Sequence, residues 1–251
     1  MAGSKTLHFS DLGEIEYGAA WQLQEGLMKE GLDIKASWYN TPAAERPADL
    51  GIRNYLLFCT HPHVYTLGKS GHMENLLVND SRLQELNVAF YKTNRGGDIT
   101  YHGPGQVVGY PILDLEQFYT DLGKYMRNLE EVIIRVLAHY GIAGDRLPGS
   151  TGVWLEPDTP RARKICAMGV RSSRWITMHG FALNVNADLK YFDYIVPCGI
   201  TDKQVTSIAK ELGHPVDMEE VKVRLRDAFA ELFECSIVND KATFDNEKIV
   251  Y

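Results

Sequence analysis

Apolar residues recur at helical spacing in three stretches of the chain, residues 17–31, 122–140 and 218–233. Each stretch places them at intervals of three and four, so one side of the helix would be apolar and would face the core. We expect Gly31 to end the first helix and Gly141 the second, because glycine is common just past a helix C-terminus. Asp121 precedes the second helix and can cap its first backbone N–H groups.

Shorter runs rich in β-branched and aromatic residues lie between these helices. They predict strands over residues 55–59, 64–67, 89–93, 107–115, 153–156, 164–170, 175–185 and 205–208. The fifth, sixth and seventh runs are separated by short turns, which predicts an antiparallel meander. A short helix is expected over residues 80–86, and an exposed loop over residues 40–53, which contain two prolines. The whole pattern predicts a mixed α/β sheet covered by helices.

Length and composition are those of a globular protein. The 251 residues fit one large domain or two small ones, and 45% are hydrophobic and 24% charged. No linker is visible, so we expect one domain over 1–251, with a core from about residue 12 to 235 and a C-terminal tail over 236–251. The net charge of −7 argues against nucleic-acid binding.

Targeting signals and redox chemistry add little to this picture. Neither a signal peptide nor a run of 18 apolar residues is visible, so we expect a protein of the cytoplasm, away from membranes. We also expect a monomer. The cysteines have no Cys-x-x-Cys spacing, which argues against a metal site or a disulfide framework: Cys59, Cys166, Cys198 and Cys235. His61 and His63 could bind a metal, but no third ligand is near in sequence, so a structural or pocket-lining role is favoured.

The densest cluster of unusual residues is the segment from Arg95 to Gln106, which reads RGGDITYHGPGQ. Its glycines let the backbone take positive φ and approach a ligand closely. A glycine-rich hairpin is one interpretation and a binding loop is the other. The segment matches neither the P-loop pattern nor the dinucleotide-binding pattern of glycines. Arg95 and His102, which bracket the first glycines, favour a binding loop.

Lys164 shares one face of a predicted strand with Cys166, Met168 and Val170. If its amine is buried, the charged form is disfavoured and the side chain can take and return a proton near neutral pH. The alternative is a lysine that extends from the strand edge into solvent.

Cys198 stands between Pro197 and Gly199 at the end of an apolar run. A turn of this kind can present a side chain at the end of a strand. Most lone cysteines are inert packing residues, and no base is near in sequence. A lysine brought close in space would complete a nucleophile and its proton acceptor.

Basic residues gather in one region of this acidic chain. No acidic residue lies between Asp158 and Asp188, whereas the same region contains Arg161, Arg163, Lys164, Arg171 and Arg174. The local excess of positive charge could form a docking surface for an acidic partner. A solvated face is the other interpretation, and charge alone favours it.

Four motifs together resemble the octanoyltransferases of lipoate biosynthesis. They are RGGDITYHGPGQ at 95–106, RKICAMG at 163–169, HGFALNVN at 179–186 and Pro-Cys-Gly at 197–199. Their order and spacing also match, and the likeness extends from about residue 55 to 208. The resemblance implies a lipoate/biotin protein ligase-like fold, class II synthetase-like, with a largely antiparallel sheet flanked by helices.

The resemblance also implies an activity and a set of site residues. An octanoyl group would pass from octanoyl-acyl carrier protein, through a thioester on Cys198, to an acceptor lysine. The acceptors would be lipoyl domains of 2-oxoacid dehydrogenase complexes and the glycine cleavage H protein, and no cofactor or metal would be needed. Lys164 would promote the thiolate and act as acid and base. The acyl substrate would be held by Arg95, Gly96, Gly97, Asp98, Ile99, Thr100, Tyr101, His102, Ala167, Met168, Gly169, Gly180, Phe181 and Ala182.

Two other functions fit parts of the sequence. An ATP-dependent lipoate or biotin ligase of the same fold would activate its acid as an adenylate and would not need Cys198. A non-catalytic module could bind acylated carrier proteins through the basic region. Covalent loading by an octanoyl donor distinguishes the transferase from both.

Overall fold

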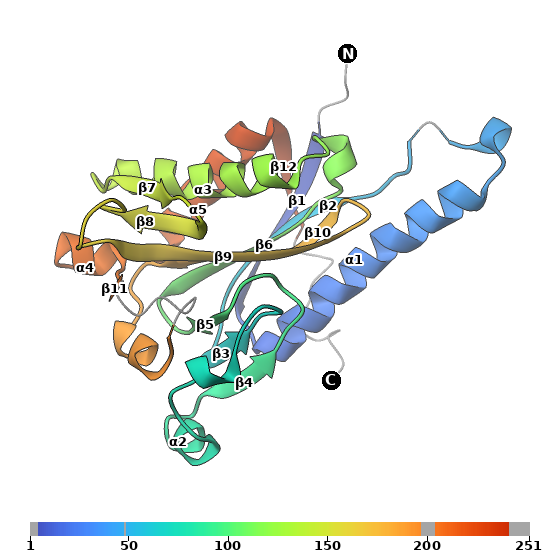
Figure 1. The fold of residues 1–251 in the computed structure, drawn as a ribbon. Coiled ribbons are helices and arrows are strands. Elements are labelled where there is room, and N and C mark those ends of the chain that lie inside the picture. The colour runs from blue at the N-terminus through green and yellow to red at the C-terminus, as the bar shows by residue number, and fades with distance from the viewer. Residues whose placement is uncertain (1–4, 48, 197–203, 241–251) are drawn as a thin grey trace.

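The computed structural model describes residues 5–47, 49–196 and 204–240, and it is built on a nine-stranded sheet (Figure 1). The strand order is β12-β1-β2-β6-β10-β9-β8-β7, with β11 paired to β9. In chain order the strands are β1 Lys5–Glu14, β2 Asn54–Thr60, β6 Gln106–Ile112, β7 Gly144–Leu147, β8 Ser150–Leu155, β9 Arg163–Ser173, β10 Ile176–Asn184, β11 Gln204–Val205 and β12 Cys235–Asn239. Among the described strands of this sheet, the pairs β1–β2, β1–β12 and β9–β11 are parallel and the other pairs are antiparallel. The predicted mixed, largely antiparallel sheet is therefore confirmed.

Helices cover both faces of this large sheet. The helix α1, Tyr17–Asn40, packs on one face, and α3, Leu122–His139, and α5, Met218–Phe233, pack together on the other (Figure 1). Within β2, Leu56 and Phe58 belong to the core under α3 and α5, whereas Leu57 belongs to the core under α1. Successive side chains of a strand point to opposite faces, so an uninterrupted apolar run produces a strand buried on both sides.

A second, three-stranded sheet lies near the N-terminal end of α1 (Figure 1). Its order is β4-β3-β5, from β3 Val64–Leu67, β4 Ala89–Lys92 and β5 Ile99–His102. Its aromatic core includes Tyr65 and Tyr101, which pack with Phe192 of the 3₁₀ helix η4, Leu189–Tyr194. The short helix α2, Asp80–Glu85, contributes Leu83 to the same core. The remaining short elements are η1 Ala43–Glu45, η2 Met73–Asn75, η3 Leu115–Gln117 and α4 Ile208–Leu212.

The first helix does not end at Gly31, as predicted, but continues to Asn40. Gly31 serves packing, because a Cβ there would lie 2.6 Å from Cδ1 of Ile176. Beyond it, the buried Lys35 Nζ donates to Asp114 Oδ1 at 2.6 Å, which fixes the additional turns to the body of the protein. The predicted loop over 40–53 therefore begins where the helix actually ends.

Three expectations at the ends of elements are wrong for a common reason. The core begins before residue 12, because β1 starts at Lys5, and part of the predicted C-terminal tail is the edge strand β12 beside β1. The expected strand over 205–208 is only the two-residue β11, after which Ser207 caps α4. These short segments are defined by tertiary pairing and capping, which local composition does not encode.

The stronger periodic segments are confirmed. Asp121 accepts a hydrogen bond from Lys124 N and caps α3, and Gly141 follows that helix with a φ of +71°. The helix α5 has the predicted bounds, and β8, β9 and β10 form the predicted meander. In the part of the chain that the structure describes, no helix is long and apolar enough to cross a membrane.

Candidate active site

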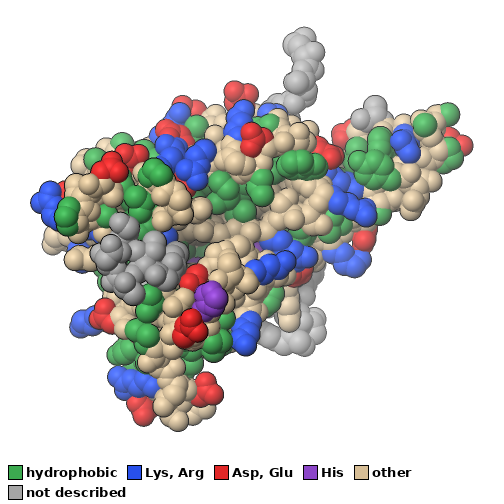
Figure 2. Space-filling model, viewed as in Figure 1, with side chains coloured by type: hydrophobic (Ala, Val, Ile, Leu, Met, Phe, Trp, Pro, Cys, Tyr) green, Lys and Arg blue, Asp and Glu red, His purple; other side chains and the backbone are tan. Residues whose placement is uncertain are grey.

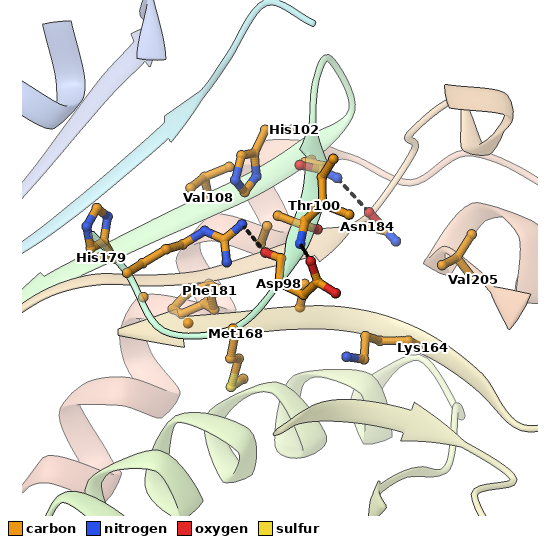
Figure 3. A pocket seen from close by; sticks show the side chains of 18 of the residues that line it. Asp98, Thr100, His102, Val108, Lys164, Met168, His179, Phe181, Asn184 and Val205 are labelled. Atoms are coloured by element: carbon orange, nitrogen blue, oxygen red, sulfur yellow. Dashed lines mark hydrogen bonds between the residues drawn. The ribbon is translucent and has the colours of Figure 1, made fainter. Parts of the chain in front are cut away.

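A cavity lies between the small sheet and the large sheet, and residues of both line it. Figure 3 shows Lys164 at one end and His179 at the other, with Met168 and Phe181 between them. The walls in the middle are apolar, and they include Val108 from β6. A concave, mostly apolar site with a few polar groups is typical of a binding site for a small organic ligand.

Arg95 fixes the first glycines of the loop against both sheets. Its buried guanidinium donates to the carbonyl oxygens of Gly96, at 3.0 Å, and Asp98, at 2.8 Å, and also to Thr66 of β3. Gly96 N donates to the carbonyl oxygen of Val170 on β9 at 2.9 Å. A Cβ on Gly169 would lie 2.6 Å from the Gly96 carbonyl oxygen, so glycine is required for this close approach.

The second group of glycines connects the two sheets and does not close a hairpin. The strand before it, β5, pairs with β3 in the small sheet, and β6 pairs with β2 and β10 in the large one. Gly105 has a φ of +83°, and a Cβ there would lie 2.5 Å from the backbone of Asn186. The loop is therefore a crossing between sheets, and the cavity lies beside it.

Lys164 is buried, with 7% of its surface exposed, so it does not extend from the strand edge into solvent. Its Nζ lies 4.7 Å from the centre of the Trp154 ring on β8. Its neighbour in register on the other side is Val205 of β11. Gly152 packs against the aliphatic part of the lysine side chain, because a Cβ at Gly152 would lie 3.6 Å from Lys164 Cε.

Outside Lys164 the cavity opens into a wider hollow, which we call the vestibule. It is lined by Lys164, Met168 and Gly169, by Met126 of α3, and by the segments around η2 and the β7–β8 turn. Cys198 lies outside the described residues. The described residues before it extend to Val196, whose N–H donates to the carbonyl oxygen of Asn75 at the vestibule wall. Those after it begin at Gln204, and the next residue, Val205, pairs with Lys164.

The two cavity histidines are neutral near pH 7. Burial, together with the neighbouring His61 and the positive charge of Arg95, keeps the pKa of His102 well below its usual value. Burial and the charges of Arg95 and Arg171 lower the pKa of His179 to about 3. Neither side chain carries a charge at physiological pH, so both act as hydrogen-bonding groups at the cavity surface.

His61 and His63 point into different clusters. The ring of His61 bonds to the carbonyl oxygen of Ile15 and to the Tyr110 hydroxyl, each at 2.7 Å. His63 bonds to the Tyr101 hydroxyl at 2.7 Å and stacks on Tyr191. Within residues 5–47, 49–196 and 204–240, no group of three or more His, Cys, Asp or Glu side chains could hold a metal ion.

The predicted basic surface is largely neutralised by carboxylates, of which Glu211 and Glu25 come from distant parts of the chain and Glu156 lies just before the basic region. Arg163 pairs with Glu211 at 2.6 Å and with Glu156 at 3.0 Å, and Arg171 pairs with Glu25 at 2.8 Å. Arg161 also pairs with Glu156. Figure 2 shows basic and acidic side chains interspersed over the visible face. The sequence spacing concealed these pairs, because all of the carboxylates lie outside the basic region.

Comparisons with known proteins agree with this geometry. Residues 17–230 match the family model of the lipoyl protein ligase A/B catalytic domain. An octanoyltransferase from Christiangramia forsetii is 55% identical over 235 residues, which are 93% of this chain and 98% of that protein. One from Flavobacterium johnsoniae is 57% identical over 236 residues, which are 94% of this chain and 100% of that protein. The chain belongs to the octanoyltransferases. It is therefore a transferase.

Solved structures place this octanoyltransferase in the expected fold. The bi-partite lipoate protein ligase of Thermoplasma acidophilum superposes with a TM-score of 0.65 at 16% identity, over 99% of this chain and 91% of that chain. A lipoate-protein ligase A bound with ATP gives 0.65 at 15% identity, over 98% and 92%. At such low identity the likeness concerns the fold alone.

Most of the predicted acyl-binding residues line the cavity of the octanoyltransferase. The segment 95–102 contributes Arg95, Gly97, Asp98, Ile99, Thr100 and His102, and the large sheet contributes Ala167, Met168, Gly169, Gly180, Phe181 and Ala182. Gly96 lines the vestibule instead.

Tyr101 is the predicted binding residue whose side chain the structure places elsewhere. Its ring is fully buried in the core of the small sheet and stacks on Tyr191 with 5.0 Å between ring centres. Strand alternation explains this position, because Thr100 and His102, its neighbours in β5, line the cavity. The Tyr101 ring therefore does not line the cavity, and its contact with the substrate stays a prediction.

Several lining residues were not predicted. Gln106 and Asn184 are buried amides in apolar strands, joined by a hydrogen bond of 2.9 Å, and isolated amides in such strands were a usable signal. The sequence favoured a groove-shaping role over a catalytic one for His102 and His179, and both line the cavity. Tyr17 comes from α1, and nothing near it in the sequence indicates that it reaches the cavity.

Proposed function

We propose that this enzyme takes an octanoyl group from octanoyl-acyl carrier protein, holds it as a thioester on Cys198 and transfers it to a lysine of a lipoyl domain. Membership of the octanoyltransferases supports the reaction class. The observation that carries the proposed course is the position of Lys164, which lies buried where an apolar cavity meets an open vestibule. The reacting carbonyl group would lie there, with the acyl chain inside and both protein partners outside.

The proposed chemistry needs one proton carrier. The Cys198 thiol gives its proton to the Lys164 amine, and the thiolate attacks the carbonyl carbon of the carrier thioester. As the adduct collapses, the bond to the carrier sulfur breaks and Lys164 returns the proton to that sulfur. In the second half the acceptor amine attacks the acyl-enzyme, an amide forms, and the proton that the amine loses passes through Lys164 to the Cys198 sulfur.

The flanks of the undescribed segment support a meeting of Cys198 with Lys164. Val196 is hydrogen-bonded to Asn75 in the vestibule wall, two residues before Cys198. After the segment, Val205 pairs with Lys164 itself. Both ends of the segment therefore reach the neighbourhood of the lysine.

The apolar walls would supply affinity for the acyl chain. Each buried methylene contributes roughly 0.8 kcal/mol, so a medium-length chain gains several kcal/mol without any polar contact. The acyl group starts in the thioester of the donor, which is an activated linkage, and ends in an amide of the acceptor, which is a stable one. The proposed reaction therefore forms no adenylate and needs no nucleotide.

Intact-mass measurement after incubation with octanoyl-acyl carrier protein tests this proposal. We expect an added octanoyl group on the wild type, none on Cys198→Ser, and unchanged loading on Cys235→Ser. The adduct should disappear when a lipoyl domain is added and should reappear on that domain. A Cys198→Ser variant that still modifies lipoyl domains when given octanoate and ATP would favour a ligase. Absence of any adduct on the wild type would contradict the thioester route.

A further inference from the structure

A β-bulge directs Lys164 into the cavity. The pairing of β8 with β9 places Cys166 opposite Val153. It places Lys164 opposite Trp154, so Ile165 has no counterpart in β8. Ile165 and Cys166 are both buried in the core beneath α3 and α5, although successive residues of a regular strand point to opposite faces. Bulges of this kind redirect side chains and are common beside active sites, and here Lys164 lines the cavity while Cys166 stays in the core.

The strand β8 contacts the lysine through a glycine and a tryptophan. A Cβ on Gly152 would lie 3.6 Å from Lys164 Cε and 2.4 Å from the carbonyl oxygen of Cys166. This close approach and a φ of +116° both require glycine. The Trp154 ring lies 4.7 Å from Lys164 Nζ, and its Nε1 donates to the carbonyl oxygen of Ser150 at 3.1 Å. The position of the lysine amine therefore depends on the position of β8.

A buried carboxylate on α3 holds this strand. Glu130 is 0% exposed, although the other buried residues of α3 are aliphatic or aromatic. Its Oε1 accepts the Gly152 N–H at 3.0 Å. Its Oε2 accepts from Arg146 of β7 at 3.1 Å and pairs with Arg127 at 3.0 Å. A carboxylate is costly to bury unless its oxygens have such partners. The side chain thus ties both strands of the β7–β8 hairpin to α3, which lies beside them (Figure 1).

The hairpin lies at the end of the large sheet and forms part of the vestibule wall. Among the described strands, β7 is the edge strand and pairs only with β8. The segment that follows β7 contributes Gly149, Ser150 and Thr151 to the vestibule. Elements at the margin of a structure open more readily than those in its core. Glu130 is not among the described residues that line the cavity or the vestibule, so any effect of it on the reaction passes through its neighbours.

We propose that Glu130 is a positioning residue, which fixes the Lys164 amine at the junction of the cavity and the vestibule. This inference rests on the proposed function, in which Lys164 carries the proton to and from Cys198. The carboxylate holds Gly152, and Gly152 and Trp154 confine the lysine side chain. Removing the carboxylate leaves the Gly152 N–H without its acceptor and frees β8 to shift. A small displacement of a catalytic group is enough to slow the reaction.

A double-mutant cycle tests this route. Octanoyl loading from saturating octanoyl-acyl carrier protein is followed by intact mass in the wild type, Glu130→Ala, Lys164→Ala and the double variant. We expect Glu130→Ala to slow loading on the order of tenfold when Lys164 is present. In the Lys164→Ala background it should slow loading by less than about twofold, because Glu130 acts through the lysine. A purely structural role would slow both backgrounds alike.

The adjacent carboxylate offers a matched control. Glu131 pairs with the same Arg146 at 2.8 Å, and Glu131→Ala leaves the hydrogen bond between Glu130 and Gly152 in place. We expect this variant to load at the wild-type rate. Where loading in the Lys164→Ala background is too slow to follow, the rate of Cys198 alkylation by iodoacetamide replaces it as the readout of the cycle.

Two further variants of Glu130 cover poor folding and test the hydrogen bond itself. Glu130→Met fills the same volume but cannot accept the Gly152 hydrogen, so it replaces Glu130→Ala in the cycle if that variant does not fold. Glu130→Gln retains an oxygen that can accept this hydrogen, and it should load within about threefold of the wild-type rate.

The outcomes separate this inference from the proposed function. An equal fold-change in both backgrounds, or a Glu130→Gln variant as slow as Glu130→Met, would overturn positioning through Gly152 and leave the proposed function intact. Absence of octanoyl loading on the wild type, or loading that Lys164→Ala leaves unchanged, would overturn the proposed function and this inference with it.

Discussion

Three of the four cysteines have thiols that resist ionisation. Burial raises the pKa of Cys59 and of Cys166 far above the usual range, and it raises the pKa of Cys235 to about 11. Because only the thiolate reacts with alkylating reagents, these three thiols should react slowly near neutral pH. Fast alkylation of the native protein would therefore report on Cys198.

We predict that Lys164→Ala moves the pH dependence of this fast alkylation upward by at least one pH unit, because the proposed proton acceptor of Cys198 is lost. Iodoacetamide labelling followed by peptide mass mapping measures the rate at Cys198. Lys190→Ala, which removes a lysine from η4 that does not line the cavity, serves as the control. An unchanged profile in Lys164→Ala would contradict the pairing.

His61 makes the stability of the protein sensitive to acid. Burial lowers its pKa from 6.5 to about 4. In the unfolded chain the imidazole takes up a proton near pH 6.5, whereas in the folded protein it stays neutral until about pH 4. The unfolded state therefore binds more protons in this window, so the free energy of unfolding falls as the pH falls from 6.5 to 4. The contribution is on the order of 3 kcal/mol.

We predict that His61→Gln reduces this loss of stability. Urea denaturation at pH 7 and at pH 5 measures the free energy of unfolding, and the difference between the two pH values should be smaller by at least 1 kcal/mol in the variant. His214→Gln changes an exposed histidine and should retain the wild-type difference. Equal differences in His61→Gln and the wild type would show that this side chain titrates normally.

Single residues could be predicted where a local pattern carried the signal. The alternation around Lys164 identified the residue but favoured a position at the strand edge in solvent, and the structure finds it buried instead. Asn94, which orients His179, lies 85 positions before it in the sequence, so no local pattern could join them. The partners of Arg163 and Arg171 were hidden for the same reason.

At the scale of elements, α1 depends on one buried ion pair. Lys35 Nζ contacts Asp114 Oδ1 at 2.6 Å, Glu116 Oε2 at 3.0 Å and the carbonyl oxygen of Arg174 at 2.8 Å. Asp114 caps η3, Glu116 lies in it, and Arg174 lies in the β9–β10 turn. Lys35 therefore joins the C-terminal half of the helix both to η3 and to the turn between the last two strands of the meander.

We predict that Lys35→Met lowers the free energy of unfolding by about 3 kcal/mol, because it leaves the Asp114 carboxylate buried without its cation. Lys29→Met, on the exposed side of the same helix, removes a surface pair with Asp33 and should cost less than about 1 kcal/mol. Urea denaturation measures both variants. Similar costs would mean that the buried pair adds little beyond a surface one.

The ends of a helix could be predicted from the sequence where a capping residue and a set of apolar positions on one helix face indicated the same bounds. The helices α3 and α5 each have an aspartate cap and an apolar stripe, and both were located correctly. The helix α1 has no side-chain cap at its N-terminus. Gly31 resembles the glycine that commonly follows a helix C-terminus, although the helix continues past it. The edge strand β12 is only five residues long and pairs along its length with β1, a partner more than 200 positions earlier in the sequence.

At the scale of the whole molecule, the cavity is a product of two sheets that the sequence did not separate. The predicted strands were assigned to one sheet, yet β3, β4 and β5 form their own. The segment 95–106 was recognised as a binding loop, but its crossing from one sheet to the other is a non-local property. The site therefore depends on how firmly the small sheet is held against the large one.

We predict that octanoyl loading strengthens this contact, because an acyl chain in the cavity touches β5 on one side and β9 and β10 on the other. A ligand bound to the folded state alone slows local opening of the segments that it bridges. Hydrogen exchange measured by mass spectrometry should therefore slow at least threefold at residues 95–103 and at residues 164–182. The helix α5, on the opposite face of the large sheet, is the internal control and should keep its exchange rate. Protection confined to β9 and β10 would show that the chain lies on the large sheet without reaching the small one.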